Sequence, residues 1–449
     1  MSTPAKAMPS RAAEIVGAAN FTDDPAQLAA YEVEGERPSA AARPEAANEV
    51  AELVKLAAAE KLAVIPMGAR TKLSIGMPPV RYDLAIDMTR LDRVISYDPG
   101  DLTLSVEAGI PLAKLAATLA EHQQFLPLEV PFYERATIGG TLASGVDSPL
   151  RQMYGTARDF VLGMEFVTGD GALAKSGGRV VKNVSGYDLH KLMLGAIGSL
   201  GIMTRVNFKT FPLAAESRGW LVGFARAEEA FALTDSIRKS PLAPQTVEIF
   251  DRPATAILDA RLPIDRTEWS VAISAAGNER VLERSAGDLQ KMSRDLNAAT
   301  FRALDGSAAA SLFTAIREFP ALTAKQFTDG VVARITTLPT QMAETVQFLK
   351  NIAAGRGLPC AVFARGVGVI YFALLPAERD APAIARCMKE IFAATADNQC
   401  ATIPWCPLEL KREMSVWGSP REDFLLMQRV KQAFDPHGIF APGRFVGGL

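Results

Sequence analysis

Histidine is scarce in this sequence of 449 residues, which contains only His122, His190 and His437. No two of them have the spacing of metal ligands, and no H-E-x-x-H motif occurs. The chain also lacks a G-x-S-x-G elbow, and no glycine is followed directly by lysine, so a Walker A loop is absent. The sequence therefore shows no apparatus for a hydrolase or an NTPase.

Cysteine and net charge are low as well. The four cysteines form no C-x-x-C pair, and Cys400 and Cys406 have a spacing that matches no common zinc or iron–sulfur site. We interpret all four as buried or incidental thiols. The net charge of −2, from 48 basic and 50 acidic residues, gives no electrostatic case for binding nucleic acid.

Long apolar runs are missing too. The N-terminus has no continuous apolar segment of the signal-peptide kind. The longest apolar runs, such as Val367 to Leu375, are far shorter than the about 20 residues that cross a bilayer. We therefore expect a cytoplasmic protein that associates with a membrane only through a partner.

The length is sufficient for two or three domains, and the alternation of elements predicts an α+β protein. Residues 1–45 are rich in Ala, Pro, Glu and Arg and are expected to form an N-terminal extension that packs only in part. Residues 46–215 place strands and helices around glycine-rich turns. Residues 216–418 repeat strand–helix–strand units, which predicts an antiparallel sheet with helices on one face. Residues 419–449 predict a helix and a turn-rich tail.

The start of that last helix carries a clear signal. Ser419-Pro420-Arg421-Glu422 predicts a capping box with proline at the first helical position. Leu426, Val430, Ala433 and Phe434 then follow at helical spacing and predict its apolar face.

Three glycine-rich turns punctuate the first half, at Pro66 to Leu73, Thr137 to Gly145 and Tyr154 to Gly163. Successive backbone N–H groups in the first turn can form a nest for an anion, to which Arg70 and Lys72 would add positive charge. The adjacent glycines of the second turn allow the backbone to approach a flat or phosphorylated ligand closely. Taken alone, each is also explained as a surface turn.

A fourth glycine-rich segment occupies residues 182–204, KNVSGYDLHKLMLGAIGSLGIMT. Its glycines come after a helix pattern and lead into a strand, whereas a Rossmann fingerprint has strand, glycines and helix in that order. Gly195 is interpreted as the residue that ends the helix, predicted at about Tyr187 to Leu194.

In this order the motifs resemble one family. PFYERATIGG, YGTARDFVLG with VTGDG, KNVSGYDLHKL, GSLGIMT and the terminal FDPHGIFAPGR are similar to motifs of the FAD-linked oxidases of the vanillyl-alcohol-oxidase (PCMH) type. The resemblance is dense over residues 45–215 and returns at 424–446. Within the family, PLEVPFYERATIGG, the Thr-Lys pair of the first turn and RDFVLG most resemble the E subunits of bacterial glycolate oxidases.

The resemblance implies an FAD-binding domain of two α+β subdomains at residues 46–215, with the cofactor between them. It further implies an α+β cap domain with an antiparallel sheet at 216–418, and a C-terminal segment, 419–449, that returns to the FAD domain. The turn at Gly198 would pass close to the adenine and ribose, and Lys182 to Tyr187 would wall the flavin site. The implied FAD contacts are Pro66, Gly68, Ala69, Arg70, Thr71, Lys72, Leu73, Pro131, Thr137, Gly139, Gly140, Ala143, Ser144, Gly145, Gly155, Asp159, Val161, Gly198, Gly201, Ile202 and Arg444.

The FAD is expected to be held without a covalent link, because Pro66 to Pro79 and Pro131 to Pro149 contain no histidine or cysteine. The sequence assigns no catalytic residue and no metal ligand. The hydroxy-acid dehydrogenases of this family carry a histidine cluster in the cap half, whereas residues 216–449 contain only His437. That histidine lies in a turn, which is a poor place for a general base. Arg151, Arg158 and Arg444 are the candidates for binding a carboxylate.

We therefore expect an FAD-binding subunit of a glycolate-oxidising complex that acts on a small 2-hydroxy acid. Its partners would be a catalytic flavoprotein subunit and an iron–sulfur subunit. One alternative is a stand-alone FAD-dependent dehydrogenase for a hydroxy acid or alcohol, which the scarcity of histidine disfavours. The other is a structural subunit without flavin, which the intact glycine turns disfavour.

Overall fold

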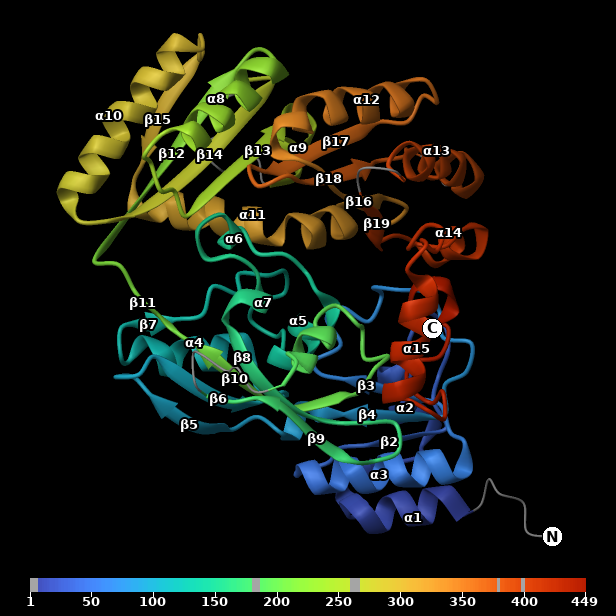
Figure 1. The fold of residues 1–449 in the computed structure, drawn as a ribbon. Helices are drawn as coiled ribbons and strands as arrows, with labels where there is room; N and C mark the ends of the chain where they lie inside the picture. The colour runs from blue at the N-terminus through green and yellow to red at the C-terminus, as the bar shows by residue number, and fades with distance from the viewer. Residues whose placement is uncertain (1–6, 180–185, 259–266, 378–379, 397–399) are drawn as a thin grey trace.

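The computed structural model describes residues 7–179, 186–258, 267–377, 380–396 and 400–449 (Figure 1). In this part of the chain the strands form sheets of four, five, two and eight members. The three smaller sheets belong to the N-terminal half, which ends with β11 (Phe211–Pro212), and the eight-stranded sheet belongs to the C-terminal half. The predicted α+β class, with two subdomains and an antiparallel cap sheet, is confirmed.

The first sheet is built around a parallel core. Its strands, in spatial order, are β1 (Phe21–Thr22), β2 (Ala40–Ala42), β4 (Leu84–Asp87) and β3 (Val64–Met67). Strands β2 and β3 both run parallel to β4, while β1 is antiparallel to β2. Helix α3 (Ala47–Glu60) buries its apolar face against this sheet, and α1 (Ala7–Val16) packs against α3.

The N-terminal segment is therefore an integral part of this sheet. Ala12, Ala40 and Ala42 are completely buried in its core. Asp23 to Gln27 of the same segment are exposed, so buried and exposed parts alternate along it, and the expectation that residues 1–45 pack only in part stays a prediction. The buried strand β2 could not be predicted from the sequence, because its short alanine side chains produce no strong apolar periodicity.

The second sheet is antiparallel throughout. Its strands, in spatial order, are β5 (Val94–Asp98), β6 (Thr103–Glu107), β10 (Ile202–Lys209), β8 (Val161–Val167) and β9 (Leu173–Gly177). Its helices are α4 (Leu112–Ala120), α5 (Ile138–Ser144), α6 (Arg151–Tyr154) and α7 (Ala157–Phe160). A short ribbon pairs β7 (Gln124–Phe125) with β11. The helix predicted at about Tyr187 to Leu194 is a single 3₁₀ turn, Leu189–Leu192. So short a segment gains little from helix propagation.

The eight strands of the cap sheet are antiparallel at every pairing. In spatial order they are β15 (Thr300–Leu304), β12 (Glu216–Phe224), β14 (Trp269–Gly277), β13 (Thr246–Asp251), β17 (Cys360–Arg365), β18 (Val369–Leu374), β16 (Val331–Thr336) and β19 (Cys400–Trp405). Trp220, Val222 and Phe224 pack on one face, while Leu221 packs on the other. This alternation is the strand period of two.

Helices cover both faces of the cap sheet. The outer face carries α8 (Ala227–Lys239), α10 (Glu279–Asp295), α12 (Met342–Ala354) and α13 (Ala381–Ala394). The inner face carries α9 (Arg252–Leu258) and α11 (Gly306–Gln326), and α11 lies between the sheet and the N-terminal half (Figure 1). The prediction of helices on one face is therefore wrong. Helix α11 contains Pro320, and a proline inside a helical pattern weakens the helical signal.

The C-terminal segment returns to the first sheet. After α14 (Leu408–Glu413), helix α15 spans Phe424–Phe434, so the predicted capping box at Ser419 to Glu422 is wrong. Residue 423, an aspartate, is the N-cap and makes no capping hydrogen bond. Beyond α15, the N–H of Val64 donates to the carbonyl of Ile439 at 2.8 Å, and Ala441 donates to the carbonyl of Val64 at 2.9 Å. The tail thus extends the first sheet beside β3.

Candidate functional site

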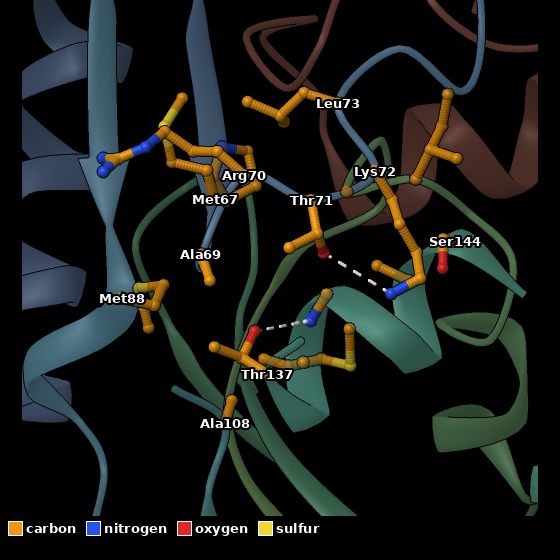
Figure 2. Close-up of a pocket in the computed structure, with 18 of the residues that line it drawn as sticks. Met67, Ala69, Arg70, Thr71, Lys72, Leu73, Met88, Ala108, Thr137 and Ser144 are labelled. Atoms are coloured by element: carbon orange, nitrogen blue, oxygen red, sulfur yellow. Dashed lines mark hydrogen bonds between the residues drawn. The ribbon is translucent and has the colours of Figure 1, made fainter. Parts of the chain in front are cut away.

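A cavity of about 760 Å³ opens where the first two sheets meet, and we call it the first cavity (Figure 2). Its walls are the turn after β3, helix α5, the turn before β10 and the C-terminal tail. Most of the residues implied as FAD contacts line it: Pro66, Gly68, Ala69, Arg70, Thr71, Lys72, Leu73, Thr137, Gly139, Gly140, Ala143, Ser144, Gly198, Gly201, Ile202 and Arg444.

Several apolar lining residues could not be singled out from the sequence. They are Met67, Ile75, Met88, Ala108, Ile197 and Met203. Each stands at the end of a strand or in a turn and is indistinguishable there from an ordinary core residue. They supply the apolar walls of the cavity.

The turn after β3 presents unused hydrogen-bond donors to the cavity. In the described part of the chain, the main-chain N–H groups of Ala69 to Leu73 have no protein acceptor. Gly68 brings this turn against the start of α5, because a Cβ atom there would lie 2.1 Å from the Thr137 hydroxyl oxygen. Thr137 in turn caps α5 by accepting a hydrogen bond from the N–H of Gly140 at 3.3 Å. These are the donors that the predicted nest for an anion requires.

Lys72 places a buried positive charge in the same wall. The residue is 8% exposed, and its ammonium donates to the Thr71 hydroxyl at 3.4 Å (Figure 2). No carboxylate lies within ion-pair distance of it among the described residues, and burial lowers the pKa of Lys72 to about 8. Glu318 of α11 opposes that shift, but its own oxygens accept from Arg317 and from the N–H of Phe132.

The two arginines of the first cavity have other partners. Arg70 forms a salt bridge with Asp87 at 3.0 Å and lies over the Tyr31 ring, with its guanidinium directed away from Lys72 (Figure 2). Arg444 is 2% exposed and donates to the carbonyls of Leu73, Ile75 and Met77. The expectation that Arg444 binds a carboxylate is therefore not supported, since its donors hold the turn after β3 in place.

The glycines of the fourth segment hold the backbone close to the other walls. Gly198 has φ +79°, and a Cβ atom there would approach the Pro66 ring to 2.8 Å. A Cβ atom on Gly201 would lie 2.9 Å from the carbonyl oxygen of Val167. Gly195 packs against Gly145 and donates to the carbonyl of Leu142 at 2.9 Å, so it caps α5 instead of ending its own helix.

The remaining implied contacts lie elsewhere. Gly145 and Gly155 line a second cavity, on the other side of α5. Asp159 caps α7 by accepting from the N–H and the hydroxyl of Thr156. Val161 is buried in the core of the second sheet, and Pro131 is buried outside both cavities. Local glycine-rich and capping patterns do not distinguish such structural roles from ligand contact. Lys182 to Ser185 of the predicted flavin wall lie outside the described residues.

Histidine and cysteine do not line either cavity in the part of the chain that the structure describes. His190 is buried, 3.0 Å from the Ser176 hydroxyl through Nδ1, and burial lowers its pKa. Burial also raises the pKa of Cys406 to about 12, so its thiol stays protonated. Within the same described ranges, no group of His, Cys, Asp and Glu side chains is arranged to hold a metal ion. Nor is any described helix long and apolar enough to span a bilayer.

Comparison with known proteins identifies both the class of protein and the family. An FAD-binding domain model matches residues 38–177, and the C-terminal domain model of the FAD-linked oxidases matches residues 214–398 and 411–445. The chain therefore belongs to the FAD-linked oxidases.

Two relatives and one structure illustrate the similarity. An uncharacterized FAD-linked oxidoreductase of Mycobacterium tuberculosis is 29% identical over 98% of this chain and 99% of its own length. The glycolate oxidase subunit GlcE of Escherichia coli is 39% identical over 36% of this chain and 46% of that subunit. The structure of p-cresol methylhydroxylase with substrate bound has a TM-score of 0.79 at 16% identity, covering 99% of this chain and 97% of that one. The chain is thus an FAD-linked oxidoreductase related to glycolate oxidase subunits.

The first cavity fits the anionic part of FAD. Its unused N–H groups and its unpaired ammonium are complementary to a diphosphate, and its apolar walls are complementary to flat rings. When bound, FAD supplies an acceptor for two electrons. The residues that would hold it are those of the turn after β3, with Lys72 for charge, and the small residues of α5.

Proposed function

We propose that this chain is the FAD-binding subunit of a glycolate oxidase-type complex and takes part in oxidising a small 2-hydroxy acid. The observation that carries the proposal is the first cavity. There the ammonium of Lys72 has no carboxylate partner and the N–H groups of Ala69 to Leu73 have no protein acceptor among the described residues, so both can bind an anion. The similarity to the GlcE subunit, which spans 36% of the chain, supports the assignment to a complex. We propose a cytoplasmic location, with membrane association through the partners.

The groups around the two cavities support a subunit role over independent turnover. Oxidation of a 2-hydroxy acid to a 2-oxo acid removes two electrons and two protons, so one side chain must accept a proton from the substrate. Among the described residues, neither cavity is lined by a histidine, and the one lining carboxylate, Asp147, is engaged by Arg151 and Arg365. A partner flavoprotein subunit would supply the base and the substrate oxidation, and an iron–sulfur subunit would carry the electrons onward.

Anaerobic bleaching of the flavin tests this proposal. The isolated FAD-loaded protein is mixed with glycolate or D-lactate, and the absorbance of oxidised flavin is followed. We expect negligible bleaching by the isolated chain, and dye reduction together with a co-purifying complex after co-expression with the two partner subunits. Rapid stoichiometric bleaching of the isolated chain would overturn the proposal in favour of a stand-alone dehydrogenase. Purification without any flavin, and failure to take it up, would favour a structural subunit.

A further inference from the structure

Helix α15 packs on the molecule without a single fully buried residue. It lies at the side of the N-terminal half, near β3 (Figure 1). The structure describes all of its residues, of which Leu425 and Leu426 are 59% and 63% exposed. Of the other residues of the predicted apolar face, Ala433 is exposed, and Val430 and Phe434 are half-buried. A helix that buries so little apolar surface can detach locally from the fold at a low free-energy cost.

One basic side chain makes the polar contacts between this helix and the wall of the first cavity. The side chain of Lys431 is 11% exposed. Its ammonium donates to the carbonyl of Ser199 at 2.7 Å and to the carbonyl of Phe440 at 2.9 Å, and it pairs with Asp435 at 2.7 Å. An ammonium has three donors, so these contacts use all of them. Lys431 is therefore occupied in holding other parts of the chain.

The Ser199 carbonyl belongs to a turn that forms one wall of the first cavity. Ser199 is buried and stands between Gly198 and Gly201, both of which line the cavity. The backbone at Gly198 lies against the ring of Pro66, another lining residue, so a shift of this turn would alter two walls. Loss of the ammonium would take a charge-assisted donor from a buried carbonyl, which is costly.

The anionic partner of the ammonium connects the same contact to the first sheet. The carboxylate of Asp435 is buried and accepts from the N–H groups of Ile439 at 3.1 Å and Phe440 at 2.8 Å. Ile439 and Phe440 are completely buried in the core of the first sheet, where Ile439 pairs with Val64 of β3. The tail is thus anchored by its own core contacts, and α15 can detach without it.

Two other buried cations of the C-terminal segment make the same kind of contact. Lys411 of α14 has a fully buried side chain that donates to the carbonyl of Ser74 and pairs with Glu34 at 2.9 Å. Arg444 donates to three carbonyls of the turn after β3. Cations from three separate points of the segment therefore hold carbonyls beside the first cavity, so the shape of this cavity depends on how the C-terminal segment docks.

We infer that α15 is a movable brace of the first cavity and that Lys431 is a positioning residue for FAD. The helix docks and undocks as a unit, and the docked form binds FAD more tightly because the Ser199 turn is then fixed. By thermodynamic linkage, bound FAD holds α15 in the docked form. The coupling acts through the Ser199 turn and needs no contact between Lys431 and the cofactor. It rests on FAD binding by this family and not on the proposed subunit role.

Hydrogen exchange of the wild type with and without FAD tests the coupling. We expect the amides of α15 to exchange through local undocking. At a free FAD concentration 100-fold above Kd, their exchange should therefore slow by up to about 100-fold. The locally exchanging amides of α10, on the outer face of the cap sheet, should keep their rates. Equal exchange of α15 in the two samples would overturn the inference.

Substitutions of Lys431 locate the coupling. Lys431→Met should weaken FAD binding by about tenfold, as for the loss of one charge-assisted hydrogen bond, and should speed exchange in α15. Lys431→Arg keeps a cationic donor and should bind FAD more tightly than Lys431→Met does. Arg429→Met is the matched control, because it removes an exposed charge from the same helix, and it should leave both FAD affinity and exchange unchanged.

A paired variant serves if Lys431→Met does not fold. Lys431→Met combined with Asp435→Asn removes both charges and leaves no buried carboxylate unpaired, and it should show the same weaker FAD binding and faster exchange of α15. A wild-type Kd for FAD in this variant, or a weaker Kd with unchanged exchange of α15, would contradict the coupling. None of these measurements uses a hydroxy acid or a partner subunit, so their outcome is separate from that of the bleaching test.

Discussion

Replacing Lys72 by methionine tests the electrostatics of the first cavity. The side chain is 8% exposed, and its ammonium has one long hydrogen bond, to Thr71. Methionine keeps an unbranched apolar stem of similar length and removes the charge. We expect the substitution to stabilise the flavin-free protein and to weaken FAD binding. The buried charge destabilises the fold when no anion is bound, and it attracts the diphosphate when FAD is bound.

The size of both effects follows from the pKa of Lys72. Burial lowers it from 10.5 to about 8 in the flavin-free fold. At about 1.4 kcal/mol per unit, holding this ammonium in the fold destabilises the protein by about 3 kcal/mol below pH 8. Flavin-free Lys72→Met should therefore be more stable than the wild type at pH 7, by up to about 3 kcal/mol. Pairing with a diphosphate removes the penalty in the wild type, so the variant should bind FAD about 100-fold more weakly.

The pH dependence has a definite sign. Between about pH 8 and 10.5 the unfolded chain binds more protons at this lysine than the flavin-free fold does, so flavin-free stability rises with pH in that window. Binding of FAD to a neutral Lys72 requires uptake of a proton. The wild-type Kd for FAD should therefore be constant below about pH 8 and weaken by up to tenfold per pH unit above it, whereas Lys72→Met should lack this dependence.

Flavin fluorescence quenching measures the Kd, and urea unfolding of the flavin-free protein measures the stability. Lys55→Met is the control, because Lys55 lies on the exposed face of α3 with 53% of its side chain accessible. A flavin-free Lys72→Met that is less stable than the wild type would refute the idea of an uncompensated charge. An unchanged Kd for FAD would refute the pairing.

Three further predictions follow from the same wall. Gly140→Val should abolish FAD retention in a folded protein, because the new side chain enters the cavity and its Cβ atom has one close neighbour, Thr137 Oγ1 at 3.1 Å. The control Gly287→Val on α10 places a Cβ atom with no other atom within 4 Å and should retain FAD. Equal flavin absorbance in the two variants would contradict this prediction. Arg444→Met should lower both Tm and FAD content, by about 1–3 kcal/mol in stability for each buried carbonyl left without a donor, because three carbonyls of the 73–77 turn lose the guanidinium. Acid precipitation should leave the yellow colour in the supernatant, since no His or Cys lines the first cavity among the described residues, and a yellow pellet would show a covalent link.

Backbone features of the site could be predicted from the sequence, because a glycine marks a position where the backbone comes too close to another segment for a Cβ atom. Gly68 and Gly198 each stand where a Cβ atom would collide with another segment, with Thr137 in one case and Pro66 in the other. A sequence shows such positions as glycines in otherwise apolar surroundings. These glycines, together with the resemblance to the FAD-linked oxidases, indicate the cavity walls in separate parts of the chain.

Side-chain direction could not be predicted in the same way. Arg70, Lys72 and Arg444 are equivalent in the sequence as cations beside a glycine turn, yet only Lys72 lacks a compensating partner in the described structure. Arg70 turns toward Asp87, whose strand is parallel to β3, and Arg444 arrives from the far end of the chain. Both partnerships are long-range, so no local pattern indicates them.

The charge of Lys72 also bears on why the chain would need a partner subunit. A lysine whose pKa lies near 8 has the proton affinity of a general base, and Lys72 lines the first cavity. An anion beside the ammonium favours its charged form and raises that pKa again. Binding of a diphosphate at this lysine would therefore remove the group best suited to accept a proton, and the other described lining residues of the first cavity offer no carboxylate or imidazole in its place. In this arrangement the residue that would hold the cofactor could not also deprotonate the substrate, which agrees with the subunit role that we propose.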